Sequence, residues 1–416
     1  MVDSTASTTE TPKYGTTRGN FAQARDPSLK YSDDIDPTLS FFYSSKTISL
    51  LILMLFVLLY VALGSNSQDT VGNIKMGILA AAFVFIFIGL VQFGDGAFIR
   101  PHPAIWRIVL AASVLYEMFL VFILFQNATD ARLLFKYIDP ALGIPLPDRS
   151  YAENCDFTVS NVWDSMDAFV LAHSIGWFCK AIILRDYWFC WIISIMFEFM
   201  EYSLQHQLAN FAECWWDHWI LDVLVCNWLG TYVGMKFCEY FSMRHYSWRG
   251  IKQIPDYRGK VKRTVQQFTP HSWTTFHWGA TESFKNYVAV ILLLAAVLMC
   301  ELNAFYLKTL LWLPPEHYLN ISRLLLFFLI ATPAVREVYQ FLMDKNCKRI
   351  GAQAWLAIAC IMTEALIILK FGRNEFPNPA PSHIKIFWVV LLSLVAIYPV
   401  WQFLIKPRLE KVEKKD

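Results

Sequence analysis

The chain has 416 residues, of which 56% are hydrophobic and only 17% are charged, and its formal net charge is +2 at pH 7. Soluble proteins contain about 25% charged residues, and the mean hydropathy here is +0.38. That much apolar surface excludes a water-soluble protein, and the near-neutral charge gives no sign of nucleic-acid binding. An aromatic fraction of 16% fits rings at membrane interfaces. We therefore predict an all-α, polytopic integral membrane protein.

The N-terminal residues 1–45 are polar and rich in Ser and Thr. This composition predicts a disordered tail, and it contains no cleavable signal peptide. The nine cysteines predict no disulfide framework, because most of them lie inside apolar runs as buried thiols. Those in apolar runs are Cys179, Cys190, Cys226, Cys238, Cys300 and Cys360.

A membrane-spanning helix needs about 20 apolar residues to cross roughly 30 Å of hydrocarbon. Ten stretches qualify: 46–64, 75–93, 104–126, 162–184, 186–204, 217–241, 284–311, 319–341, 353–371 and 383–405. Helices are the expected spanning element because a helix satisfies its own backbone hydrogen bonds. We predict about ten transmembrane helices in one membrane domain, residues 46–405, followed by a basic tail, residues 406–416.

The distribution of Lys and Arg predicts the orientation of these helices, because cytosolic segments carry more of both. With the N-terminus in the cytosol and ten alternating helices, the cytosolic segments hold 21 basic residues and the opposite segments hold 4. Both termini, segment 94–103 and the basic loop 242–283 are then cytosolic. Gly230 and Gly234 form a small-xxx-small pair, which predicts close packing of the helix at 217–241.

Acidic residues inside predicted spans mark the candidate site, because each carboxylate at mid-membrane costs about 2.5–3.5 kcal/mol. Glu198 and Glu201 share one helix face. Glu213 and Asp217 would share a second face with Asn210 if the next helix begins near Asn210. The acidic residues in this region are Glu198, Glu201, Glu213, Asp217 and Asp222. Oxygen ligands without thiolates suit a hard cation such as Ca²⁺ or Mg²⁺.

His173, in stretch 162–184, falls in the same lumenal half of the membrane as the acidic residues. This shared depth across three helices of 162–241 predicts one site. Two structural alternatives remain open: a polar network that only holds helices together, and a histidine that only packs. Two functional alternatives also remain: a cation-coupled transporter, since buried acids serve ion exchange, and a membrane acyltransferase.

Several long segments resemble the eukaryotic phosphatidylserine synthases, the base-exchange enzymes of the endoplasmic reticulum. They are RPHPAIWR (100–107), KYIDPALGIPLPDR (136–149), FEFMEYSLQHQL (197–208), NFAECWWDHWILDVLVCN (210–227), KRTVQQFTP (262–270) and WLPPEHYL (312–319). The resemblance covers about residues 38–405. The GIPLPDR, EYSLQHQL and PPEHYL segments are more similar to the type 2, ethanolamine-exchanging form than to the choline-exchanging type 1. The signature of CDP-alcohol phosphotransferases is missing.

The resemblance implies a Ca²⁺-dependent reaction in which L-serine replaces the ethanolamine headgroup of phosphatidylethanolamine. The same reaction with phosphatidylcholine as donor is the alternative. The family's essential polar set corresponds to His173, Glu198, Glu201, Asn210, Glu213, Asp217 and Asp222, with the five acids as metal ligands. His173 would serve as general base or as nucleophile. A homodimer surrounded by membrane lipids is also implied.

The resemblance further implies feedback inhibition by the product, phosphatidylserine. The corresponding positions are Arg100, His102, Arg263, Gln267 and Pro270. In the predicted topology these residues lie on the cytosolic side, and the acidic site lies toward the lumen. A regulatory lipid site separate from the reaction site follows from that arrangement. The alternative is that Arg100 and the basic loop only anchor to anionic headgroups.

Overall fold

The computed structural model describes residues 46–413 except 65–68, 97, 99–100, 148–149, 153, 165, 167, 243–253, 268–275, 345–346, 374 and 377. All regular elements within the described residues are helical. The longer ones are α1 (Thr47–Gly64), α2 (Thr70–Gln92), α3 (Pro103–Leu124), α6 (Ala168–Leu184), α7 (Tyr187–Leu204), α8 (Trp228–Ser242), α10 (Phe284–Leu310), α11 (Tyr318–Met343), α12 (Ala352–Phe371) and α13 (Ser382–Val400). The shorter ones are α4 (Ala128–Ile138), α5 (Val159–Asp164), η2 (Ala209–Phe211), η3 (Asp217–Asn227), α9 (Tyr257–Gln267), η5 (Trp401–Ile405) and α14 (Lys406–Glu413).

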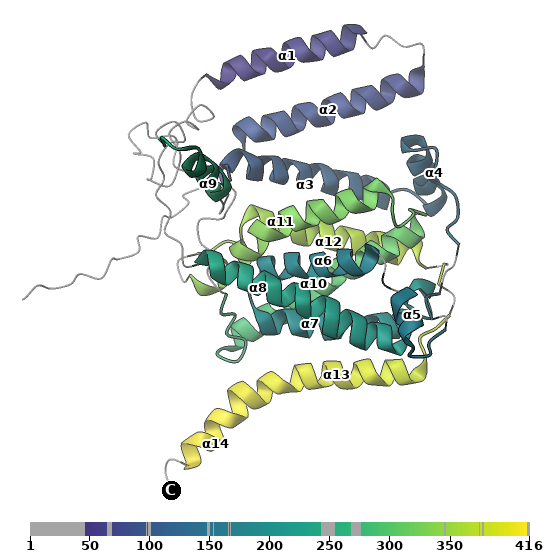
Figure 1. Cartoon of the computed structure of the whole chain (residues 1–416), viewed down its shortest axis with the longest axis vertical. Coiled ribbons are helices and arrows are strands. Elements are labelled where there is room, and N and C mark those ends of the chain that lie inside the picture. Colours follow the sequence, from purple (N-terminus) through teal and green to yellow (C-terminus); the bar gives the residue numbers. More distant parts are fainter. Residues whose placement is uncertain are drawn as a thin grey trace, which may run out of the picture.

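The helices form a central bundle flanked by two peripheral groups (Figure 1). Helices α3, α6, α7, α8, α10, α11 and α12 lie side by side in the bundle. The purple α1 and α2 lie along one side of it, and the yellow α13 lies along the other. Met54 is the one buried residue within α1, so this helix presents apolar side chains to its surroundings, as a lipid-facing helix does.

Seven helices of the described chain are long and apolar enough to cross a membrane: Thr47–Gly64, Thr70–Gln92, Pro103–Leu124, Phe284–Leu310, Tyr318–Met343, Ala352–Phe371 and Ser382–Leu409. A polytopic all-α membrane protein is thereby confirmed. The other three predicted spans coincide with α6, α7 and the continuous pair η3–α8, which contain the polar residues. A total of ten crossings stays a prediction. The predicted single helix 162–184 is wrong in detail, because α5 ends at Asp164 and α6 begins at Ala168.

Helix direction brings three chain segments to one end of the bundle. Helix α6 runs away from α5, α7 returns toward it, and η3 starts again at that end (Figure 1). The turn at the other end is short because Asp186 accepts a hydrogen bond from the backbone N–H of Phe189, which caps α7. The start of α6, the end of α7 and the start of η3 are therefore neighbours.

Two glycines allow α8 to contact α6 closely, as the small-xxx-small pair predicts. A Cβ on Gly230 would lie 2.3 Å from the carbonyl oxygen of Ser174, and one on Gly234 would lie 2.7 Å from Cβ of Ala181. Only glycine has room at such distances. The α6–α8 contact therefore depends on these positions, and it fixes the helix that carries His173.

A buried ion pair joins the helices behind the site. Arg323 on α11 binds the carboxylate of Glu364 on α12 through two guanidinium nitrogens, at 2.7 and 2.5 Å. The hydroxyl of Tyr116 (α3) and the amide of Asn303 (α10) donate to the same carboxylate, at 2.5 and 3.1 Å. Four helices thus meet at one carboxylate whose hydrogen-bonding capacity is satisfied, which is the condition for tolerating a buried charge.

Candidate functional site

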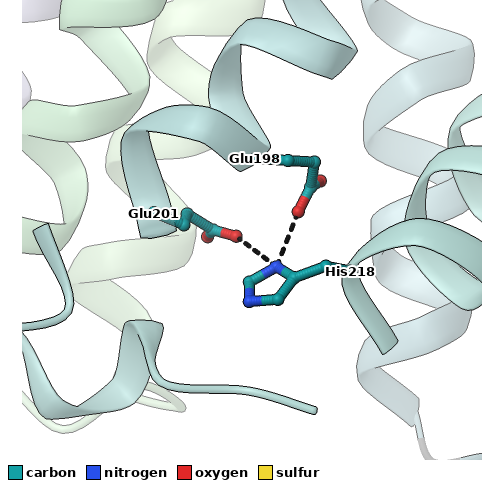
Figure 2. Close-up of side chains that lie close together, drawn as sticks. All are labelled: Glu198, Glu201 and His218. Atoms are coloured by element: carbon teal, nitrogen blue, oxygen red, sulfur yellow. Dashed lines mark hydrogen bonds and ion pairs between the residues drawn. The ribbon is translucent and has the colours of Figure 1, made fainter. Parts of the chain in front are cut away.

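Three side chains from α7 and η3 converge in the interior of the bundle (Figure 2). Nδ1 of His218 lies 2.8 Å from Oε2 of Glu198 and 3.6 Å from Oε2 of Glu201. All three residues are buried, and one ligand atom from each lies within 4.8 Å of the other two. This grouping has the size and the atom types of a metal site.

Two further acids surround this centre. Oε2 of Glu213, in the loop between η2 and η3, lies 3.8 Å from Nδ1 of His218. Asp217 repels both Glu213 and Asp222 electrostatically, so these side chains also lie near one another. Burial raises the pKa of the Glu213 carboxyl to about 7. Five carboxyl groups around a single imidazole leave a strong excess of negative charge.

His173 lies at the edge of the acidic group. Its Nε2 is 3.9 Å from Oδ1 of Asp222 and accepts a hydrogen bond from Nε1 of Trp177 at 3.2 Å. Because Nε2 accepts this hydrogen bond, the ring proton of a neutral His173 lies on Nδ1. The imidazole is therefore held with its basic nitrogen near the acids, and it is not one of the three residues that form the closest cluster.

The predicted face formed by Asn210, Glu213 and Asp217 is wrong, because no single helix contains all three. Asn210 lies in the short η2, Glu213 in the loop 212–214, and the long helix starts at Trp215. Glu213 still reaches the cluster from its loop. No interaction between Asn210 and the cluster is found among the described residues.

Two residues of the site escaped the sequence analysis. His218 was not among the residues predicted for the site, although it lies at its centre. Asn227 is 2% exposed, donates to Oγ of Ser194 at 2.7 Å, and lies beside His173. Its Oδ1 is buried without a hydrogen-bond partner within the described chain. A buried polar residue among the apolar side chains of 217–241 was the available signal for both.

A disulfide between Cys155 and Cys214 closes the loop region over this end of the bundle. Cys214 directly follows Glu213, and the backbone N–H of Tyr151 donates to the carbonyl of Ala212 at 3.0 Å. The expectation of no disulfide is therefore wrong for this pair, since both cysteines lie in polar segments between spans. The six cysteines in apolar runs are free, as predicted.

The donor chemistry of the site fits Ca²⁺, which takes several carboxylate and carbonyl oxygens. Glu198, Glu201 and Glu213 point oxygens at one position, where His218 Nδ1 now sits among them. The acids Asp217 and Asp222 add further oxygens nearby. One imidazole nitrogen is a less usual Ca²⁺ ligand, so the oxygen atoms are the group that would hold the ion.

Two of the residues predicted to bind a regulatory lipid, His102 and Arg263, lie at the opposite end of the bundle from the acids. His102 caps α3 by accepting from the backbone N–H of Ala104 at 2.9 Å, and Arg263 on α9 is 2% exposed. Helix α9 and the start of α3 lie at the same end of the bundle, the end away from α5 (Figure 1). Arg100 and Pro270 lie outside the described residues, as does the side chain of Gln267.

Comparison with known proteins gives one consistent family. The family model described as "Phosphatidyl serine synthase" matches residues 101–372. "Phosphatidylserine synthase 2" of Danio rerio is 47% identical over 381 residues, which are 89% of this chain and 84% of that protein. The Homo sapiens protein of the same name is also 47% identical, over 89% of this chain and 78% of its own length.

A plant relative has a different name. "CDP-diacylglycerol--serine O-phosphatidyltransferase 1" of Arabidopsis thaliana is 39% identical over 389 residues, which are 90% of this chain and 92% of that protein. Both names describe the attachment of a phosphatidyl group to serine. The chain therefore belongs to the phosphatidylserine synthase family, and its match is to the type 2 form.

Proposed function

We propose that this protein makes phosphatidylserine by Ca²⁺-dependent base exchange, in which L-serine replaces the ethanolamine headgroup of phosphatidylethanolamine. The observation that supports this proposal is the convergence of three glutamates on one buried position, beside His173, in a phosphatidylserine synthase. The reaction needs two things from the protein: neutralisation of a phosphodiester's negative charge and removal of a proton from a hydroxyl.

The acids meet the first need by holding a cation. A phosphodiester carries negative non-bridging oxygens that repel an approaching nucleophile. Bound Ca²⁺ supplies the charge neutralisation that allows attack at phosphorus. In this chain Glu198, Glu201 and Glu213 would hold the ion, with Asp217 and Asp222 beside it. The Nδ1–H of His218 donates to the Glu198 carboxylate and fixes it.

His173 meets the second need. The hydroxyl of serine is a poor nucleophile at neutral pH and requires a base within hydrogen-bond reach. Nε2 is the basic nitrogen of the neutral tautomer that Trp177 selects. That nitrogen releases the Trp177 N–H and takes the serine proton as the oxygen attacks phosphorus, and Asp222 at 3.9 Å stabilises the resulting imidazolium. The proton then passes to the leaving ethanolamine oxygen.

Asn227 offers a binding group for a polar substrate. A buried acceptor without a partner costs about 1–3 kcal/mol, and Oδ1 of Asn227 is such an acceptor within the described chain. The ammonium group of serine or of ethanolamine donates to an amide oxygen. We assign Asn227 to the amine of the bound base, next to the His173 that acts on the hydroxyl.

The names of the relatives differ in whether they specify the donor of the phosphatidyl group. The name of the Arabidopsis protein specifies CDP-diacylglycerol, whereas the type 2 names do not specify a donor. Two features favour an exchange of phospholipid headgroups here: the missing CDP-alcohol signature and the segments similar to the ethanolamine-exchanging form. Phosphatidylcholine is the alternative donor.

We place the site toward the lumen of the endoplasmic reticulum, with both termini cytosolic. The excess of Lys and Arg in the opposite segments, 21 against 4, supports this orientation. The Cys155–Cys214 disulfide next to Glu213 supports it independently, because disulfides persist in oxidising compartments. Phosphatidylserine as feedback inhibitor would then bind near His102 and Arg263 on the cytosolic side, in a protein that we expect to be a homodimer.

The deciding experiment measures labelled serine incorporation by the purified protein in liposomes. Each liposome contains one donor among phosphatidylethanolamine, phosphatidylcholine and CDP-diacylglycerol, and each is tested with Ca²⁺ and with chelator. We expect phosphatidylserine from phosphatidylethanolamine only, and only with Ca²⁺. Product from CDP-diacylglycerol would replace base exchange by the chemistry in the plant protein's name. Absence of product together with cation flux would support a transporter.

A further inference from the structure

A groove of about 500 Å³ lies between α7, α10 and α13, outside the acidic site. Its walls are almost entirely apolar. They include Met196 and Met200 from α7, Ala295, Leu298 and Met299 from α10, and Trp388 from α13. The space is therefore lined by hydrocarbon and thioether groups, which adapt to flexible apolar ligands.

Helix geometry separates this groove from the acids. Met196, Met200, Ser203 and Gln207 follow one another at i+4, i+7 and i+11 along α7 and its end, so they share a face. Glu198 and Glu201 fall between these positions and point into the bundle. At about 100° per residue, the two sets lie on opposite sides of α7. The groove is not part of the reaction site.

The ionisable side chains at the polar end of the groove are all basic. The ionisable residues in its lining are His206 and Lys385, and no carboxylate lines it. Nδ1 of His206 is 2.9 Å from the carbonyl oxygen of Ser203, and its Nε2 is buried without a hydrogen-bond partner in the described chain. Lys385 is exposed, and no ion pair of its side chain is found among the described residues.

The residues that line the groove lie at different depths in the membrane. His206 and Gln207 follow the end of α7, and Lys385 lies in the first turn of α13. These residues mark the membrane surface at the end of the bundle where the acids lie. Met196 and Ala295 lie farther along their helices, toward the middle of the membrane. The groove thus has a cationic rim at the surface and an apolar interior.

We propose that this groove binds a glycerophospholipid as a second lipid site, with one acyl chain along α7 and α10 and the phosphate at Lys385 and His206. Charge complementarity identifies the occupant, since an anionic phosphate above an apolar chain matches a cationic rim above an apolar groove. The bound lipid fills the space beside α13, whose contacts with α7 include the Phe199–Phe387 ring pair at 5.3 Å and the Trp388–Ser203 hydrogen bond at 2.9 Å. It therefore holds α13 against the bundle.

The test uses the full chain in phosphatidylcholine nanodiscs that contain a small fraction of phosphatidylglycerol with a diazirine in its acyl chain. Phosphatidylglycerol is neither the proposed donor nor the proposed product, and chelator is present without serine. After irradiation, mass spectrometry maps the labelled residues. We expect labels on Met196, Met200 and Leu298, because these residues line the groove.

Three groove variants and two matched controls test the assignment. Ala295→Phe fills the apolar interior of the groove, and we expect a several-fold loss of these labels, whereas Ala81→Phe on the lipid-facing side of α2 leaves them unchanged. Lys385→Gln removes the charge at the rim, and we expect about a two- to fivefold loss. Lys406→Gln on α14 is its control. Leu298→Trp is a second filling variant on the same face of α10.

The labelling results can be told apart from a failure of the proposed base exchange. Labels unchanged by both Ala295→Phe and Leu298→Trp, or spread evenly over the lipid-facing helices, would overturn the lipid site. Labels lost in the filling variants but unchanged in Lys385→Gln would overturn the phosphate position. Because labelling requires neither serine nor Ca²⁺, a failure of base exchange would leave this result intact.

Discussion

The indole N–H of Trp177 donates to Nε2 of His173 across one turn of α6, at 3.2 Å. The far side of the indole is covered by Lys180, whose Nζ lies 3.8 Å from the ring centroid and 2.7 Å from Oε1 of Glu301 on α10. Trp177 is itself 2% exposed. A fixed indole therefore orients the imidazole toward Asp222, and Glu301 of the neighbouring α10 holds the Lys180 that covers the indole.

Replacement of Trp177 by Phe keeps an aromatic ring and removes the N–H donor. We expect kcat to fall about three- to tenfold, the equivalent of one neutral hydrogen bond, with KM for serine little changed because His173 is not assigned to bind the substrate. Trp188→Phe, on an exposed side of α7, is the control. A change in KM alone, with kcat retained, would contradict a positioning role for Trp177.

Replacement of Glu198 by Gln tests the cation site. The variant removes a charge 2.8 Å from His218, and we expect a loss of about 10- to 100-fold in Ca²⁺ affinity. The measurement is the increase in melting temperature with Ca²⁺ concentration, because a ligand that binds the folded state stabilises it. Glu239→Gln, an exposed residue paired with Lys236, should retain the full increase. An unchanged titration curve for Glu198→Gln would remove this residue from the site.

Replacement of Gly230 by Ala tests whether α8 positions the site helix. The added Cβ would lie 2.3 Å from a backbone oxygen and 2.8 Å from Cβ of Trp177, so α6 and α8 must separate. We expect destabilisation of about 1–3 kcal/mol and a loss of activity. Gly176→Ala is the matched control, since its Cβ would meet nothing within 4 Å. Equal melting temperatures for the two variants would show that the close contact is dispensable.

The cap residue His102 predicts a pH dependence of stability. Burial lowers its pKa below 6.5, the Arg107 guanidinium lowers it further, and Asp95 opposes both. The unfolded chain therefore gains a proton at a higher pH than the folded protein does, so stability falls as pH decreases from about 7 toward the lowered pKa. The protonated ring also cannot accept from Ala104.

The corresponding measurement is thermal unfolding at about pH 7.5 and about pH 5.5, on either side of the ordinary histidine pKa. His102→Asn keeps an N-cap acceptor and removes the titrating group, so its melting temperature should change less between the two values. A variant that loses as much stability as the parent protein would assign the pH dependence to other groups.

Removal of the disulfide should loosen the loop beside Glu213. Cys155 and Cys214 are 59 positions apart, and a link across such a separation contributes about 2–5 kcal/mol. We expect Cys155→Ser to lower the melting temperature and to expose residues 150–158 to protease. Cys347→Ser, which removes a free thiol, is the control. A protease pattern identical to that of the parent protein would indicate that backbone contacts alone hold the loop.

Local patterns in the sequence predicted several features correctly. Apolar runs predicted helices because a helix in a membrane satisfies its own backbone groups, which does not depend on distant residues. The i, i+3 spacing of Glu198 and Glu201 predicted a shared helix face, because helix geometry is also local. Gly230 and Gly234 predicted a close contact, although they did not identify α6 as the partner.

Other features depended on the packing of segments far apart in the chain. The i, i+3, i+7 spacing suggested one face for Asn210, Glu213 and Asp217, but the chain there forms a short turn, a loop and then a π-helix. The break between α5 and α6 falls at the polar residues Asp164, Ser165 and Asp167, which the predicted span 162–184 included in one helix. The apolar residues on either side of this short polar run hid the break.

By itself, the sequence determined that this is a helical membrane protein with a costly acidic group in its interior, because burial of charge in hydrocarbon is expensive wherever it occurs. Tertiary structure alone decided that His218 sits at the centre of the acids, that Cys155 reaches Cys214, and that a groove lies between α7, α10 and α13. Each of these depends on how helices rotate and approach one another. That rotation follows from side-chain packing over the whole bundle, which no local pattern contains.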